Sequence, residues 1–356
     1  MSDVQASTTF SRPRWSPWWP FWALSAALLP AAVWSLLSGP MALSGSDVGQ
    51  GLLNALTQAP SSGAADWVVR ELRLPRVVLA MLVGAGLAVA GTLTQGVFRN
   101  PLADPGLIGV ASGAALAAVA VIVLSSTWLA GWVSLTGPFA LPLAAFAGGL
   151  GVTLVIYRLG TRHGQTQVAL LLLAGVAVNV LAGAATGVLT YMANDQQLRD
   201  MTFWSMGSLA YGRWREILAL LLFILLPLLI SLRSARVLNA LLMGERVAEH
   251  LGFDVQRARR WLLACAAMMV GAAVAVVGMI GFIGLVVPHL LRLLIGADHR
   301  YLLPASAVGG ALLLLLADTL ARTLLAPADL PVGLVMALIG GPVFLGLLLQ
   351  QAGRWR

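Results

Sequence analysis

The chain of 356 residues is 59% hydrophobic and only 10% charged, and its mean hydropathy is +0.88. So much apolar surface cannot be buried in the core of a water-soluble protein, and this excludes a soluble globular fold. The formal net charge is +8, and all 22 basic residues are arginines that are spread between apolar runs. Because these arginines do not gather on one soluble face, the charge does not support a nucleic-acid partner.

The apolar runs predict an all-α, polytopic membrane protein with about ten transmembrane helices, because each run suits a helix rather than a barrel strand. We expect a transmembrane domain at 18–350 between tails at 1–17 and 351–356. The eighth span is short for a bilayer, and Pro288 interrupts it. The predicted spans are 18–38, 75–98, 107–125, 138–159, 168–192, 214–233, 258–280, 283–296, 302–324 and 331–350.

Arginine placement predicts the orientation of these spans. With the N-terminus inside, most of the 22 arginines fall in inner loops and tails, as the positive-inside rule requires. Both termini are then cytoplasmic. The stretch "RELRLPR" at 70–76 is an exception, because it falls on the outer side before the second span.

An internal repeat supports the same topology. The segments "VGAGLAVAG" at 83–91 and "VGAAVAVVG" at 270–278 agree at six of nine positions, and similar turns follow at 106–110 and 281–285. The copies fall in spans two and seven, which are five spans apart. Because consecutive spans cross the membrane in alternate directions, an odd separation makes the two copies antiparallel. This is the inverted-repeat arrangement of many transporters.

The one sizeable inner segment, 233–260, predicts two short amphipathic helices at about 236–252. Apolar residues recur there at helical spacing, Gly244 separates the two groups, and Gly252 is a natural stop. The residues alone leave two interpretations open: a structured loop on the lipid surface, or a docking element for a cytoplasmic partner.

Two further residue types limit the possible chemistry. Lysine is absent, and a phosphate-binding loop of the G-x-x-x-x-G-K-[ST] type needs a lysine on the terminal phosphates. If ATP drives transport, ATP and Mg must therefore bind to another subunit. The single cysteine, Cys265, lies in an apolar run and excludes an intrachain disulfide framework.

A set of motifs in order along residues 65–352 resembles the FecCD/BtuC-type permease family. The motifs are "RLPR" at 73–76, "QGVFRNPLADPGLIGVASG" at 95–113, "LLLAGVAVN" at 171–179, "GERVAEHLG" at 244–252, "GFIGLVVPHLLR" at 281–292, "ADTLAR" at 317–322 and "LPVGLVMALIGGPVFLGLLL" at 330–349. The resemblance implies a BtuC-like permease of a type II ABC importer in the inner membrane. It also implies a homodimer with two cytoplasmic ATPase subunits and one periplasmic substrate-binding protein, and no nucleotide site or other cofactor on this chain.

The resemblance also implies roles for individual residues. Contact with the ATPase is expected from Gly244, Glu245, Ala248, Leu251 and Gly252. The residues expected to meet acidic groups of the binding protein are Arg73, Arg76 and Arg322, where planar guanidinium groups can hold carboxylates. An alternative for Arg322 is an ion pair with Asp318, four residues earlier on the same helix.

Two further groups of candidate residues concern the translocation path and the cargo. Breaks in the helices suggest a gate at Asn100, Pro101, Gly281, Gly284 and Pro288. The segment 194–214 is most similar to the haem branch of the family, which implies haem as cargo, with ferric siderophores or cobalamin as alternatives. Candidate substrate contacts are Arg199, Met201, Phe203 and Met206, although ordinary helix packing explains the apolar residues equally well.

A secondary transporter driven by an ion gradient is the alternative from another class. It would need ionisable groups near the middle of the membrane, yet the only clear acidic residue within a predicted span is Asp318, close to an outer end. A channel is less well supported, because no ring of charges or carbonyl groups is recognisable.

Overall fold

The computed structural model describes residues 16–60, 63–162, 165–210 and 212–353. All ten predicted spans coincide with helices, so the polytopic all-α prediction is confirmed. In the described ranges eight helical segments are long and apolar enough to cross a membrane, and α5 and α15 are shorter apolar helices. The ten are α1 (Trp19–Leu37), α4 (Leu74–Phe98), α5 (Val110–Leu124), α7 (Ala140–Leu159), α8 (Val168–Tyr191), α10–η4–α11 (Trp214–Leu232), α14 (Val255–Val277), α15 (Ile283–Ile295), α16 (His299–Leu324) and α17 (Val332–Gly353).

Additional short elements lie between the spans. A short helix α3 (Ala64–Trp67) and a π-helical turn η1 (Val68–Arg73) continue directly into α4, so the second span begins earlier than predicted. Most of the predicted tail at 1–17, and the last three residues of the tail at 351–356, lie outside the described residues. The other short elements are α2 (Gly45–Thr57), η2 (Pro105–Ile108), α6 (Ala130–Thr136), η3 (Gly137–Phe139), β1 (Thr161–Arg162), β2 (Gln165–Thr166), α9 (Asp195–Met206), α12 (Ala235–Leu242) and α13 (Glu245–His250).

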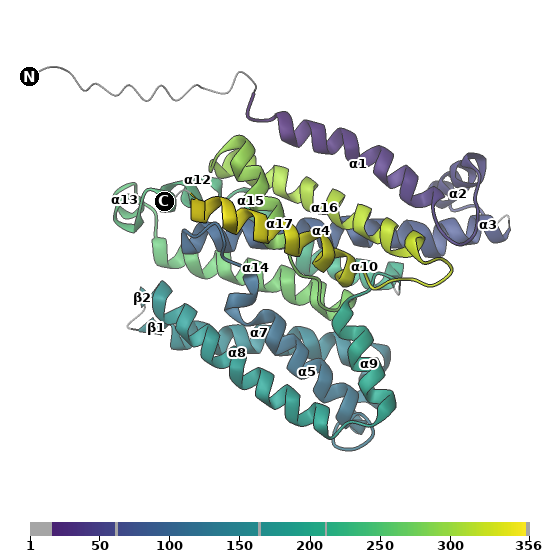
Figure 1. The fold of residues 1–356 in the computed structure, drawn as a ribbon, viewed down its shortest axis with the longest axis horizontal. Coiled ribbons are helices and arrows are strands. Elements are labelled where there is room, and N and C mark those ends of the chain that lie inside the picture. Colours follow the sequence, from purple (N-terminus) through teal and green to yellow (C-terminus); the bar gives the residue numbers. More distant parts are fainter. Residues whose placement is uncertain (1–15, 61–62, 163–164, 211, 354–356) are drawn as a thin grey trace, which may run out of the picture.

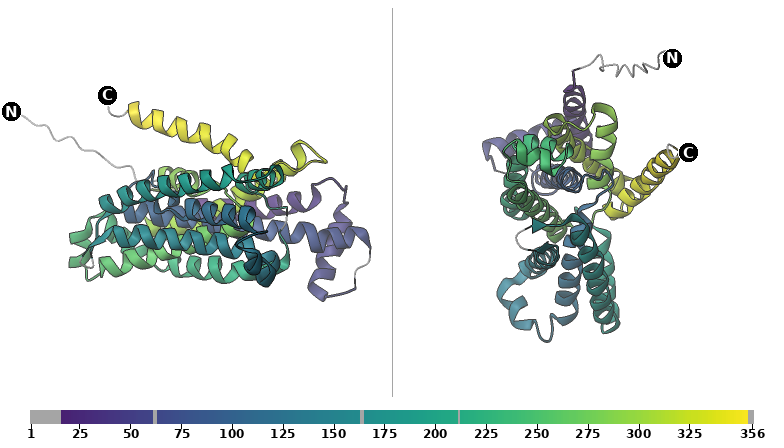
Figure 2. Two further views of the ribbon diagram at one scale, coloured as in Figure 1. Left: turned by 90° about the horizontal axis from the view of Figure 1, so that it is seen from below. Right: turned by 90° about the vertical axis from the view of Figure 1, so that its left-hand side faces the viewer.

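Two groups of helices meet along α14 (Figure 1). One group contains α1, α4, α15 and α16, and the other contains α5, α7 and α8. Helix α14 packs against both α4 and α7, so it joins the groups. Helix α17 stands away from the rest of the bundle when the molecule is viewed from its end (Figure 2).

The two copies of the repeat lie in α4 and α14, which pack side by side with opposed chain directions (Figure 1). The turns that follow them each contain one residue with a positive φ, although at different positions. Gly109 in the first turn has a φ of 79°, and Phe282 in the second has a φ of 70°. A left-handed conformation is uncommon for a bulky residue such as phenylalanine, so the second turn is held by its surroundings.

Glycines allow α4 to approach α15 and α16 closely. A Cβ atom on Gly91 would lie only 1.7 Å from the carbonyl oxygen of Gly284 in α15, and one on Gly84 would lie 2.2 Å from that of Gly310 in α16. Helices in lipid associate through close packing, because the lipid removes the hydrophobic driving force. These contacts therefore fix the position of α4 at the centre of its group.

Pro288 lies inside the continuous helix α15, and a side chain of α4 supplies a donor that the proline lacks. Proline has no N–H, so the carbonyl four residues earlier, at Gly284, loses its usual helical donor. The buried amide of Gln95 donates to this carbonyl at 3.4 Å and to that of Leu285 at 3.3 Å. A buried polar residue near the end of α4 thus satisfies backbone groups that lipid could not.

The variant Gly91→Ala tests the α4–α15 contact. The new methyl group would overlap the Gly284 carbonyl, and forcing helices apart in a packed core typically costs about 1–3 kcal/mol. We expect thermal unfolding in detergent at a clearly lower temperature than for the wild type. The matched control is Gly151→Ala in α7, where the new Cβ meets no atom within 4 Å; equal unfolding temperatures for the two variants would contradict the contact.

Candidate functional site

Helices α12 and α13 form a compact pair at one end of the bundle, as the sequence predicts (Figure 1). Gly244 between them has a φ of 116°, and Gly252 after α13 has a φ of 87°. L-amino acids with side chains rarely adopt such angles. A Cβ atom would meet no neighbour within 4 Å at either position, so glycine is required there for backbone conformation and not for space.

The pair has one buried face and one exposed apolar face. Leu238, Leu241 and Ala248 are buried against the bundle. On the face that points away from the bundle, the side chains of Met243 and Leu251 are 63% and 57% exposed. The predicted contact residue Ala248 therefore faces inwards, whereas Leu251 is available to a partner. Exposed apolar side chains gathered at a tip are typical of a surface that another protein covers.

A buried arginine connects α13 to the segment before α8. The Arg259 side chain is 1% exposed and donates to the Glu245 carboxylate at 2.7 Å and to the Thr166 carbonyl at 2.7 Å. Thr166 ends the β1–β2 hairpin, and its N–H donates to the Gln256 side chain at 2.9 Å. The α12–α13 pair, α14 and the hairpin are thus held together by one guanidinium group.

The predicted gate residues come together where two turns meet. His289, next to Pro288, lies 3.4 Å through Nδ1 from the Pro101 carbonyl. Gly281 and Gly284 line a cavity of about 180 Å³ together with Asp104–Gly106. Asn100 differs from these residues, because it is exposed and its side chain accepts a hydrogen bond from the Leu102 N–H at 3.0 Å.

Asp104 is an acidic residue of this cavity that the sequence did not single out. Its carboxylate accepts a hydrogen bond from the Gly106 N–H at 2.7 Å and so begins the 3₁₀ turn η2. Burial raises the pKa of the Asp104 carboxyl, and this hydrogen bond opposes the rise only in part.

At the opposite end of the bundle, two of the three arginines predicted to dock a partner cap helix α1. Arg73 donates to the carbonyls of Leu36 and Leu37 at 2.6 and 2.9 Å. Arg322 donates to the Ser38 carbonyl at 2.9 Å. The last carbonyl groups of a helix lack intrahelical donors and form its negative end, so two cations at this position are favourable.

The third arginine, Arg76, bridges two acidic residues. It donates to the buried carboxylate of Asp318 at 2.9 Å and to the exposed one of Asp329 at 2.7 Å. The alternative pairing of Arg322 with Asp318 is present as well, at 3.7 Å. Arg73, Arg76 and Arg322 are thus mostly buried, and their role in docking stays a prediction. They still line a cavity of about 340 Å³ that acidic groups of a partner could enter.

The four candidate substrate contacts lie on or at the end of α9, but they do not share one environment. Met201 is buried, in contact with Val119 and Val123 of α5. Phe203 is 63% exposed, Met206 is half-buried, and Arg199 pairs with the Gln196 side chain at 2.8 Å. Of these four described residues, Arg199 and Phe203 are therefore the exposed ones.

A model of the FecCD transport family matches residues 27–350. The chain belongs to the FecCD transport family. The family consists of permease subunits of ABC importers, in which ATP hydrolysis occurs on a separate ATPase subunit.

Relatives of this FecCD permease include transporters named for two kinds of cargo. It is 52% identical over 301 residues to the hemin transport system permease protein HmuU of Yersinia pestis, covering 82% of this chain and 86% of that relative. It is 45% identical over 290 residues to the cobalamin import system permease protein BtuC of Halobacterium salinarum, covering 82% of this chain and 75% of that relative. It is 43% identical over 292 residues to the vitamin B12 import system permease protein BtuC of Salmonella paratyphi A, covering 82% of this chain and 86% of that relative.

A solved structure supports the same assignment. It is described as an inward-facing conformation of an ABC transporter of the metal-chelate type, and it matches this FecCD permease with a TM-score of 0.79 and 32% identity, over 93% of this chain and 98% of that one. The chain is therefore a permease of a type II ABC importer, expected to work with ATPase and substrate-binding partners. The alternative of a secondary transporter driven by an ion gradient is wrong.

Sequence reasoning missed the partners that fix the functional segments of this FecCD permease. Arg259 lies beside Val255 and Leu262 on the buried face of α14, as the helical period predicts, but no sequence pattern identifies Glu245 and Thr166 as its partners. Gln95 lies in the motif at 95–113, but no sequence pattern indicates that its side chain bonds to the backbone of α15. Asp329 lies in a loop whose path no local pattern predicts.

Replacing Asp318 by Asn tests the network that fastens α1, α4 and α16. The variant would leave buried guanidinium groups without their shared counter-charge, a loss that typically costs about 3–5 kcal/mol. We expect a large fall in the thermal unfolding temperature in detergent. Asp329→Asn is the control, because Asp329 is 34% exposed and water can replace part of its interaction with Arg76, so a smaller fall is expected. An equal fall for both variants would show that Asp318 is not the central residue.

Proposed function

We propose that this permease carries haem from a periplasmic binding protein into the cytoplasm, as one half of a homodimer served by two ATPase subunits. The observation that carries the choice of cargo is the 52% identity to a hemin permease, against 45% and 43% to cobalamin permeases. Cobalamin or a ferric siderophore remains the alternative cargo for the same machinery. Haem would be cargo and not a cofactor of this chain.

The proposed orientation places α12 and α13 on the cytoplasmic side of the inner membrane, with both termini on that side. The bias of arginine towards the loops and tails at this end supports it. The exposed Met243, Val247 and Leu251 then form an apolar tip that would enter the ATPase. Glu245 and the two flanking glycines would set the angle at which this tip projects.

The proposed homodimer is supported by the exposure of α8 and α17. Among the described residues of α8, Leu173, Val180 and Leu181 are each between 66% and 69% exposed, and Leu338 of α17 is 77% exposed. Helix α17 also stands apart from the other helices of the chain (Figure 2). Two copies meeting through these helices would enclose a path between them, which matches the placement of transport sites between repeated units.

The buried contact of Arg259 suggests how nucleotide-driven movement would reach that path. Closure of the ATPase subunits would displace α13 through its exposed tip. Because Arg259 holds both Glu245 and the Thr166 carbonyl, the hairpin immediately before α8 would move with α13. The movement would be of the rigid-body kind, since each contact is short and the guanidinium is buried.

The outer end would receive the binding protein. Arg73, Arg76 and Arg322 line a shared cavity there, and their charges would attract acidic residues of the two lobes of that protein. On α9, the exposed Arg199 would counter the anionic groups of the cargo and the exposed Phe203 would contact its apolar ring. Met206 is a candidate for the rim of the same surface.

The choice of cargo is tested by uptake into liposomes that contain the permease and its ATPase. With the cognate binding protein and ATP, we expect uptake of hemin and none of cobalamin or a ferric siderophore. Uptake should cease when ATP is replaced by an imposed proton gradient. Transport of cobalamin at a rate equal to or above that of hemin would overturn the proposed cargo but leave the importer assignment intact.

Arg259→Lys tests the coupling contact. Lysine keeps the charge but cannot hold two acceptors with a planar fork, so hemin uptake should fall by about tenfold or more while ATP hydrolysis continues. The control is Arg236→Lys, at an exposed position on α12. If Arg259→Lys transports at the wild-type rate, or loses uptake and hydrolysis in parallel with its folded fraction, the contact has no coupling role.

A further inference from the structure

The loop between α5 and α7, residues 125–139, contains α6 and η3 and has an exposed apolar face. The side chains of Trp128 and Leu135 are 90% and 84% exposed, and that of Trp132 is 40% exposed. Trp132 and Leu135 stand three residues apart on α6, so they lie on the same side of that helix. Exposed apolar surface of this kind is typical of a region that lipid or another molecule covers.

The loop lies within a long stretch of chain that carries no charge. From residue 105 to residue 157 the sequence contains no Asp, Glu, Lys, Arg or His. Helix α9, which packs against α5, is different, because it contains Asp195, Arg199 and Asp200. A loop in water can carry charges freely, whereas a charged side chain in the apolar layer of a membrane costs about 2.5–3.5 kcal/mol. The absence of charge therefore favours contact with lipid.

The hydroxyl groups of α6 bond to its own backbone. Ser134 donates to the Gly131 carbonyl at 2.9 Å, and Thr136 donates to the Trp132 carbonyl at 2.7 Å. Where water is scarce, a polar group needs a partner within the chain. These bonds therefore suit a segment that lies against lipid.

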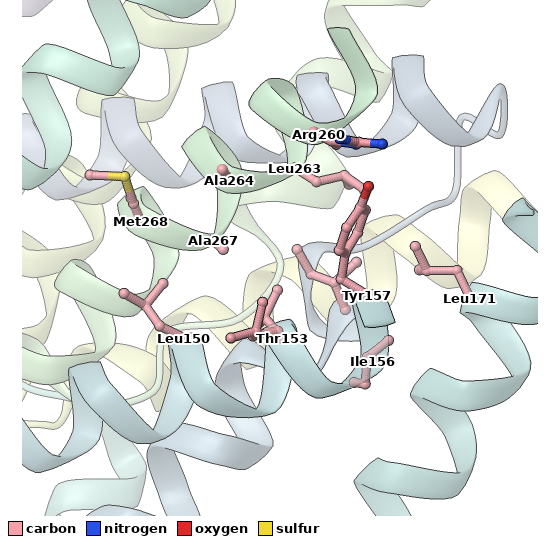
Figure 3. A pocket seen from close by; sticks show the side chains of 12 residues that line it. Leu150, Thr153, Ile156, Tyr157, Leu171, Arg260, Leu263, Ala264, Ala267 and Met268 are labelled. Atoms are coloured by element: carbon pink, nitrogen blue, oxygen red, sulfur yellow. The ribbon is translucent and has the colours of Figure 1, made fainter. Parts of the chain in front are cut away.

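The length of α7 places the loop at the surface of the apolar layer. This helix has 20 residues and is about 30 Å long, which matches the hydrocarbon thickness of a typical bilayer. Its charged residue, Arg158, stands at the end far from the loop. Figure 3 shows Tyr157 and Arg260 of α14 towards that end, whereas the apolar Leu150 and Met268 lie towards the other. With Arg158 at one surface of the membrane, the first residue of α7 lies at the opposite surface.

Two neighbouring helices point to the same level. Helix α5 starts after Gly109, beside Ile156 of α7, and its 15 residues extend about 22 Å, so it does not carry the loop beyond the apolar layer. At the other end of the loop, the guanidinium of Arg215 lies 4.2 Å from the centre of the Phe139 ring. Arg215 directly follows Trp214, the first residue of a membrane span. Arginine and tryptophan at the end of a span lie at the level of the lipid headgroups, so Phe139 lies there as well.

We propose that the α5–α7 loop inserts Trp128, Trp132 and Leu135 into the interface of the lipid bilayer and anchors the bundle there. Tryptophan is enriched at this level of a membrane, because its ring is apolar and its N–H is polar. A lipid surface is the occupant that an uncharged loop suits, since protein partners normally use charged or polar groups to fix their register. The anchor does not depend on the identity of the cargo.

The anchor would also set the depth of α9. The Gln197 side chain of α9 donates to the carbonyls of Ile122 and Val123, close to the start of the loop, at 3.2 and 3.1 Å. Met201 of α9 belongs to the same buried cluster as Val123. A loop held at the membrane surface therefore also holds the helix on which the candidate substrate contacts lie.

Spin labels on single cysteines test the depth of the loop. The full chain carries Cys265→Ala, which removes its only cysteine, together with either Leu135→Cys or Leu56→Cys, and is reconstituted into phosphatidylcholine vesicles. Oxygen concentrates in the apolar layer of a membrane, whereas a nickel chelate stays in water, so the two collision rates of a label measure its depth. We expect the label at position 135 to collide with oxygen several-fold more often, and with the chelate several-fold less often, than the label at position 56.

Leu56 is a matched control, because its side chain is also 84% exposed. It lies on α2, which packs against α3, the first part of a continuous helix of 35 residues that is too long for the apolar layer alone. A label at position 135 that collides with the chelate more often than with oxygen, as a label in water does, would overturn the proposal. A label there that is immobilised and shielded from both reagents would reveal a protein contact in place of lipid, with the same consequence.

Trp128→Asp tests whether the apolar side chains hold the loop. A carboxylate at this position should draw the loop away from lipid, so chelate collisions at position 135 should rise several-fold. Trp128 is 90% exposed, so the unfolding temperature should stay close to that of the wild type. The control is Trp261→Asp, at an exposed tryptophan near the start of α14, which should leave the label at position 135 unchanged. Unchanged depth of this label with Trp128→Asp, or an equal change with Trp261→Asp, would contradict anchoring by the loop.

Discussion

The structure depends on satisfying backbone groups wherever a helix ends or breaks near lipid, because no water is present there to do so. Long side chains from other helices perform this task. Gln95 supplies the donor that Pro288 removes from α15, and Gln197 of α9 donates to the carbonyls of Ile122 and Val123 near the end of α5 at 3.2 and 3.1 Å. Arg73 and Arg322 do the same for α1. Each such bond fixes one helix relative to another.

In the proposed orientation, this constraint gives the arginines before the second span a structural reason to lie on the outer side, where the positive-inside rule disfavours arginine. The carboxyl-terminal end of α1 and the carboxylate of Asp318 provide negative partners there, so the charges of Arg73, Arg76 and Arg322 are matched within the chain. If a partner protein docks through these arginines, its acidic groups must compete with the carbonyls and carboxylates that the arginines already bind. The exposed Asp329 is the member of the network that such a partner could most easily displace.

Composition and periodicity were sufficient to predict every membrane span, because each span is a long apolar run whose only viable form in lipid is a helix. Gly244 and Gly252 likewise marked the ends of α13 through their conformational freedom. The helices α2 and α9 were missed because they are too polar for a search for spans. Their capping boxes, Ser44 with Asp47 and Asn194 with Gln197, were nevertheless present in the sequence. Contacts such as Arg259 with Thr166 join residues far apart in the chain, and no local pattern encodes them.

The capping of α1 also makes the first span depend on a helix near the other end of the chain. The bond from Arg322 to Ser35 joins residues separated by 287 positions, so the ninth span has to be made before the first is fully held. Until then α1 is fastened mainly by Arg73, and Asp318 has not yet arrived to balance Arg76. The first span therefore gains most of its packing only from the ninth, because α1 packs far more extensively against α16 than against α4.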